Sequence, residues 1–151
     1  MKRFSFRLQK LLDLARRREE EARSVMARKL GEVRNAETAV DQARERVREA
    51  FADMSASLGG TRIEPREIDL MQRWLARTEE TQRRLEERLA KEELAFENAR
   101  ALMTERRREL LGYERGREKA LDDWREVAGR EEAAWMEEVA STRHQARRSE
   151  S

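Results

Sequence analysis

The feature that most constrains this sequence is a run of apolar residues spaced alternately three and four positions apart. Seven of them follow one another within residues 33–54: Val33, Ala36, Val40, Ala43, Val47, Ala50 and Met54. Steps of three and four average about 3.5 residues, so they keep these side chains on one stripe of an α-helix. Such a stripe is typical of a helix that packs lengthwise against another helix.

The same spacing continues on both sides of this run. Towards the N-terminus we expect the stripe to shift by one position near residues 25 and 26 and to include Leu8, Leu11, Ala15, Ala22 and Val25. After Pro65 a second series runs from Ile68 to Val127, with polar residues at some of its positions, among them Gln82, Glu92, Arg106 and Arg117. The sequence therefore predicts two long amphipathic helices.

Composition agrees with helices and leaves little material for a sheet. Of 151 residues, 44% are charged and 38% are hydrophobic, which is too few apolar residues for a thick core. One proline, six glycines and 5% aromatic residues supply little of what turns and strands need. The sequence has no cysteine for disulfides, and no apolar stretch approaches the roughly 20 residues of a membrane span. We expect an all-α protein in a cytoplasmic setting, with no membrane span.

A turn is predicted between the two series. Gly59 and Gly60 are expected to end the first helix in the left-handed conformation that glycine adopts easily. Thr61 and Glu64 have the spacing of a capping box, and Pro65 suits the first turn of a helix. We predict a single domain over residues 1–151, with helix 1 at about 4–57, a hinge at 58–64, and helix 2 at about 65–145 followed by a frayed tail.

Two such helices joined by a short hinge pack most simply against each other. The predicted fold class is all-α, a long antiparallel two-helix coiled coil (α-hairpin) with a C-terminal helical overhang. Symmetry about the hinge places Phe4 near Lys119 and leaves helix 2 without a partner after about residue 120. The overhang then carries Trp124 and Trp135, and tryptophans without a partner on a helix indicate an interface.

No arrangement of residues indicates catalysis. The glycine pair lacks the flanking residues of a phosphate-binding loop, and the single histidine, His144, has no second ligand at a suitable spacing. Acidic clusters such as residues 19–21 lie among arginines with no pocket to desolvate them. The arginine runs at 16–18 and 106–108 are flanked by acids that repel a nucleic-acid backbone. We expect no enzymatic activity, no catalytic residue, no metal or cofactor, and no nucleic-acid partner.

Aromatic residues at two places are candidates for protein contacts. Phe4 and Phe6 stand among basic residues, where they form either an ordinary frayed terminus or a plug for an acidic, partly apolar socket. Nearer the hinge, Trp74 lies beside the second stripe and Phe51 follows Ala50, which fits either packing at the edge of the core or a docking patch. The residue pattern alone leaves both interpretations open.

The N-terminal run from Phe4 to Arg17, FSFRLQKLLDLARR, resembles the start of FliJ, a family of flagellar type III export proteins. Members of that family open with a segment of the form F-x-F-R-L-x-x-L-L and form a long antiparallel two-helix coiled coil. The length, hinge position and charge density of this sequence agree with the family.

The resemblance implies a non-enzymatic stalk or chaperone that binds the hexameric export ATPase FliI, promotes its ring assembly, links it to the export gate FlhA and serves export chaperones. It implies a cytoplasmic protein, peripheral to the inner membrane at the flagellar basal body. The ATPase ring would bind Phe4, Phe6, Arg7, Leu8 and Leu11, and the gate or another partner would dock at Phe51, Met71, Trp74 and Leu75. The alternative is a general coiled-coil scaffold, or a stalk of a related secretion or rotary ATPase system.

Overall fold

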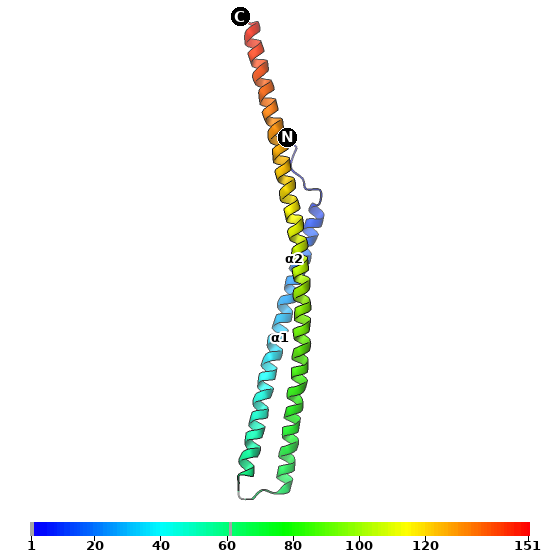
Figure 1. Cartoon of the computed structure of the whole chain (residues 1–151), viewed down its shortest axis with the longest axis vertical. Helices are drawn as coiled ribbons and strands as arrows, with labels where there is room; N and C mark the ends of the chain where they lie inside the picture. Colours follow the sequence, from blue (N-terminus) through cyan, green and yellow to red (C-terminus); the bar gives the residue numbers. More distant parts are fainter. Residues whose placement is uncertain (1, 61) are drawn as a thin grey trace. The chain divides into compact units, whose positions relative to one another are not determined.

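The structure is a computed structural model that describes residues 2–60 and 62–151. It contains helix α1, Gln9–Leu58, and helix α2, Pro65–Ser149, and no strand among those residues (Figure 1). The two helices pack against each other and run in opposite directions. The predicted all-α helical hairpin is therefore confirmed.

Contacts between residues divide the chain into two units. The terminal unit comprises Met1–Glu19 and Glu105–Ser151, and the hinge unit comprises Glu20–Thr104. Each unit contains one stretch of α1 and one stretch of α2. The chain, predicted as a single domain, therefore consists of two units, each a pair of helix segments.

The stripe that α1 buries is an unbroken heptad series. Its members, all buried or half-buried, are Leu12, Ala15, Glu19, Ala22, Met26, Lys29, Val33, Ala36, Val40, Ala43, Val47, Ala50 and Met54. The predicted shift near residues 25 and 26 is wrong, because two charged residues, Glu19 and Lys29, occupy positions of the stripe and conceal its phase. Leu12 is 0% exposed, whereas Leu11, which the pattern places in the stripe, is 44% exposed.

The stripe of α2 follows the predicted series from Ile68 to Trp124. Each member of that series is buried or half-buried, including the polar residues Gln82, Glu92, Arg106 and Arg117. The series ends there, because Val127 is exposed and the next residue, Ala128, is half-buried instead.

The glycine pair does not form the expected left-handed cap. No glycine in the described part of the chain has a positive φ. The N–H of Gly59 donates to the carbonyl of Ser55 at 3.2 Å, and the N–H of Gly60 donates to the carbonyl of Ser57 at 3.2 Å. These bonds extend the last turn of α1 in its right-handed form, so the glycines prolong the helix end instead of reversing it.

α2 begins at Pro65, as the sequence predicts. The carbonyl of Glu64 accepts hydrogen bonds from the backbone N–H groups of Glu67 at 3.0 Å and Ile68 at 3.3 Å. Glu64 is therefore the N-cap residue, and Pro65 follows it at the first helical position, where a missing N–H costs nothing. Thr61, the other residue of the expected capping box, lies outside the described residues.

Residues 2–8 are not helical, so α1 begins at Gln9 and not near residue 4 as predicted. The N–H of Gln9 donates to the carbonyl of Phe6 at 3.1 Å, which closes a turn ahead of the helix. Phe4 and Phe6 are two positions apart, and such residues point in nearly opposite directions on a helix but to the same side of an extended backbone. A non-helical segment therefore lets both rings approach α2.

Within the terminal unit, α2 extends well beyond its pairing with the N-terminal residues. Every residue after Ala128 is exposed except Val139, which is half-buried. We call the part of α2 after Ala128 the overhang; it is shorter than the predicted one, which began at about residue 120. The helix continues to Ser149, past the expected start of a frayed tail at 145, and Arg147 and Arg148 lie in its last turn, where positive charge is favourable. Neither helix, over the described residues, has an apolar stretch able to cross a membrane.

Candidate partner-binding surfaces

The N-terminal segment and α2 enclose a cleft in the terminal unit, which we call the terminal cleft. Its volume is about 420 Å³, and its lining residues are Phe4, Ser5, Phe6, Arg7, Leu8, Ala120 and Trp124. It contains four of the five residues that the family resemblance assigns to the ATPase ring. Leu11, the fifth, is not among the lining residues. The cleft also includes Trp124, which was predicted to lie in the overhang without a partner; it instead contacts Phe4 of its own chain.

Phe4 is fixed to α2 by two contacts. Its ring centroid lies 6.0 Å from that of Trp124, with the ring planes at 58°. The guanidinium carbon of Arg117 lies 5.6 Å from the centroid of the Phe4 ring, which is the geometry of a cation–π interaction. In the sequence, Arg117 and Trp124 lie two and five positions from Lys119, the residue that was predicted to lie near Phe4. Phe4 therefore packs against α2 of its own chain.

Phe6 approaches α2 at a position without a side chain. A Cβ atom added to Gly116 would meet Cζ of Phe6 at 3.8 Å. Gly116 and Arg117 could not be predicted as parts of this surface, because Gly116 is an isolated helical glycine and Arg117 is a polar member of the stripe. One signal in the sequence points to this surface: Phe4 and Phe6 are two positions apart, and this spacing favours an extended segment with both rings on one side over a helix.

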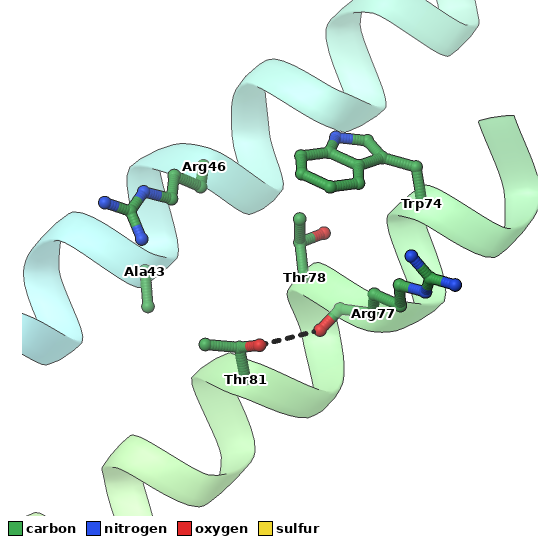
Figure 2. A pocket seen from close by; sticks show the side chains of 6 residues that line it. All are labelled: Ala43, Arg46, Trp74, Arg77, Thr78 and Thr81. Carbon is green, nitrogen blue, oxygen red and sulfur yellow. Dashed lines mark hydrogen bonds between the residues drawn. The ribbon is translucent and has the colours of Figure 1, made fainter.

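A second cleft lies between α1 and α2 in the hinge unit, and we call it the hinge cleft. Its volume is about 230 Å³, and its lining residues are Ala43, Arg46, Trp74, Arg77, Thr78 and Thr81 (Figure 2). Of the four residues assigned to the gate, only Trp74 lines it. Phe51 is exposed on α1 outside the cleft, and Met71 and Leu75 are half-buried members of the α2 stripe. The structure therefore does not gather these four residues in one cleft.

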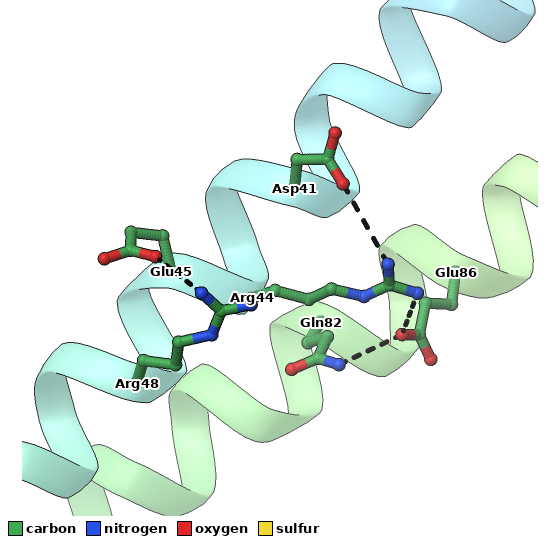
Figure 3. A network of polar contacts seen from close by, with 6 residues as sticks. All are labelled: Asp41, Arg44, Glu45, Arg48, Gln82 and Glu86. Carbon is green, nitrogen blue, oxygen red and sulfur yellow. Dashed lines mark hydrogen bonds and ion pairs between the residues drawn. The ribbon is translucent and has the colours of Figure 1, made fainter.

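A polar network links the two helices of the hinge unit (Figure 3). Arg44 of α1 donates to Oε1 of Glu86 on α2 at 3.4 Å, and Gln82 donates to the same oxygen at 3.0 Å. These hydrogen bonds, that from Gln82 foremost, lower the pKa of Glu86 below its ordinary value of 4.5 despite partial desolvation. A polar link between specified residues on two helices disfavours other registers of the pair.

A hydrogen bond from Lys29 likewise lowers the pKa of Glu32, with an Nζ to Oε2 distance of 3.1 Å. Lys29 is a half-buried member of the α1 stripe, and its ion pair with Glu32 compensates the positive charge of its ammonium group. Among residues 2–60 and 62–151, no cluster of histidine, aspartate and glutamate is placed to hold a metal ion.

Comparison with protein families identifies the chain. The model described as flagellar FliJ protein matches residues 4–149 of this sequence. The chain belongs to the FliJ family. No curated protein and no solved structure matches it. The resemblance of the N-terminal FSFRL segment to FliJ is thus confirmed.

As a FliJ-family member, this chain is a component of the flagellar type III export system, and the family is not one of known enzymes. The match begins at Phe4, the first residue of the terminal cleft, and ends at Ser149, the last residue of α2. It therefore includes the non-helical N-terminal segment, both clefts and the overhang. The overhang carries Trp135, which is 61% exposed and far along α2 from the residues of the terminal cleft.

Proposed function

We propose that this FliJ-family chain is a non-enzymatic stalk and chaperone of the flagellar export apparatus. It binds the hexameric export ATPase FliI through the terminal cleft, promotes assembly of the ring, and links the ring to the export gate FlhA through the hinge unit. It also serves export chaperones, and it works in the cytoplasm beside the inner membrane at the basal body. The family match over residues 4–149 supports this assignment.

The observation that carries the proposal is the aromatic lining of the terminal cleft. Phe4, Phe6 and Trp124 present apolar surface there, and Arg7 adds an exposed positive charge. Aromatic and arginine side chains carry most of the binding energy at protein interfaces. Because Phe4 is already fixed on α2, a partner that enters the cleft meets a preformed surface and orders few side chains on binding.

The chain promotes assembly of the FliI ring if it binds the assembled ring more strongly than it binds separate FliI subunits. A ligand shifts an equilibrium only by the difference between its affinities for the two states. A tenfold shift towards the ring requires about 1.4 kcal/mol of differential binding. Burial of one further large apolar side chain in the assembled state, at about 1.5–3 kcal/mol, meets that requirement.

The proposal assigns contact with the gate to the exposed aromatic residues of the hinge unit, Phe51 and Trp74. Both side chains are more than half exposed although each is large and apolar. Tryptophan and other aromatic residues on a surface are typical anchors of protein interfaces. Because these residues belong to a different unit from the terminal cleft, the two contacts are separable by substitution.

The test compares one double variant in each unit. Phe4→Ala/Leu8→Ala should abolish stimulation of FliI ATPase activity but leave FlhA binding intact, and Phe51→Ala/Trp74→Ala should do the reverse. Circular dichroism of both variants controls for loss of helix. If Phe4→Ala/Leu8→Ala stimulates FliI as well as the unmodified chain does, the terminal cleft is not the ring site. If the unmodified chain neither stimulates FliI nor binds FlhA, the stalk function itself is wrong.

A further inference from the structure

The hinge cleft has charges of only one sign. Arg46 of α1 and Arg77 of α2 line it, and no acidic side chain does. Neither guanidinium takes part in an ion pair within the described part of the chain. The acid next to Arg46 in the sequence, Glu45, pairs instead with Arg48 at 3.4 Å. The cleft therefore presents two positive charges that this unit does not neutralise with its own side chains.

Trp74 adds a large apolar side chain to this basic cleft. It is 58% exposed, and its indole extends from α2 towards α1, over Thr78 (Figure 2). Tryptophan and arginine are the residues most enriched among those that dominate interface energies. The cleft thus favours an occupant that brings one bulky apolar side chain together with carboxylates, because guanidinium groups pair well with carboxylates.

The overhang carries the complementary set of groups. Trp135 and Met136 are both exposed there. Glu132 and Glu138 stand three residues before and three residues after Trp135, and helical spacing places both carboxylates beside the indole. Neither glutamate side chain has an ion-pair partner within residues 62–149 of α2 or elsewhere in the described chain. The overhang therefore presents an exposed tryptophan flanked by two uncompensated negative charges.

We propose that the overhang of one chain docks in the hinge cleft of a second copy. Trp135 then packs against Trp74, and the two glutamates of the overhang face Arg46 and Arg77. Charge complementarity identifies the occupant, because one sequence supplies an acidic aromatic segment and a basic aromatic cleft, both without compensating charges. The proposal goes beyond the stalk function: it describes a state in which Trp74 and Trp135 are covered until another partner displaces them.

The geometry of this contact determines how the chains associate. It joins two different surfaces, so each added copy still offers one free cleft and one free overhang, and association continues head to tail. The cleft admits only a few side chains, which limits the interface to the small class typical of weak, transient complexes. Because the charged groups are solvent-exposed, salt weakens the association.

Sedimentation velocity of the full-length chain tests the proposal. The unmodified chain should associate at concentrations between micromolar and millimolar, at least about tenfold more weakly at about 500 mM salt than at about 50 mM. Trp74→Ala and Trp135→Ala should each remain monomeric where the unmodified chain associates. An equimolar mixture of the two should form one-to-one pairs and nothing larger, since each variant keeps one intact surface.

Charge exchange provides a second measurement. Arg46→Glu/Arg77→Glu and Glu132→Arg/Glu138→Arg should each abolish association, and a chain with all four substitutions should regain it. Phe51→Ala is the matched control, because Phe51 is 60% exposed in the hinge unit but outside the cleft. The proposal is wrong if the unmodified chain is monomeric at all concentrations. It is also wrong if Phe51→Ala weakens association as much as Trp74→Ala does, or if the mixture forms no pairs.

Discussion

Replacement of Phe4 by alanine measures how firmly the N-terminal segment is held on α2. It removes the ring contact with Trp124, at a centroid distance of 6.0 Å, and the cation–π contact with Arg117, at 5.6 Å. Contacts of these two kinds contribute about 0.5–1.5 and 0.5–1 kcal/mol, so their joint loss costs about 1–2.5 kcal/mol. The ratio of released to docked segment should then rise about 5- to 70-fold.

Limited trypsin digestion provides the assay. Trypsin cleaves after arginine where the backbone is accessible, so the initial rate of cleavage after Arg7 follows the released fraction when release is fast. Mass spectrometry identifies the fragment, and we expect its rate of formation to rise at least about fivefold in Phe4→Ala. Phe51→Ala, the same change in the hinge unit, should leave that rate unaltered. Equal rates in Phe4→Ala and the unmodified chain would refute the conclusion that these ring contacts hold the segment.

Two further predictions concern the α1 stripe and the polar network. Leu12→Ala should lower the free energy of unfolding in urea by about 2–5 kcal/mol, and by clearly more than Leu11→Ala, because Leu12 is fully buried; equal losses would contradict the observed stripe. An NMR titration should give Glu86 a pKa below 4.5, and Gln82→Ala and Arg44→Ala should each raise it, because hydrogen bonds from Gln82 and Arg44 and the charge of Arg44 all lower it. Since the folded-state pKa is lowered, the ionised carboxylate stabilises the fold above its ordinary pKa, and this stabilisation is lost as pH falls through the lowered value. An unshifted pKa would contradict the network.

The regular parts of both helices follow from sequence because their period is a local property. Apolar residues from Val33 to Met54 repeat every 3.5 residues without interruption, so a stripe is visible before any partner is known. The earlier part of the same stripe is not visible in this way. Glu19 is buried and Lys29 half-buried within it, and a pattern of apolar residues alone assigns the phase to Leu11 instead of Leu12.

In the hinge, the backbone conformations that a residue type allows differ from the one that the residue adopts. Gly59 and Gly60 allow a left-handed turn, yet both donate right-handed helical bonds to Ser55 and Ser57. Pro65 is different, because its ring fixes φ and removes the N–H, so few positions in a helix accept it. Its place at the start of α2 was therefore predictable, whereas the conformation of the glycines was not.

Sequence was sufficient for the helical hairpin, for the family and for the overhang, since each depends on periodicity or on a contiguous motif that one stretch of chain carries by itself. The two clefts depend on pairs of residues from distant stretches: Phe4 meets Trp124, and Arg46 lines the same cleft as Trp74. Which side chains meet across two helices depends on their register and on where each helix begins. Local propensity specifies neither of these to within one residue, and a change of one residue turns a helix by about 100° and brings different side chains together.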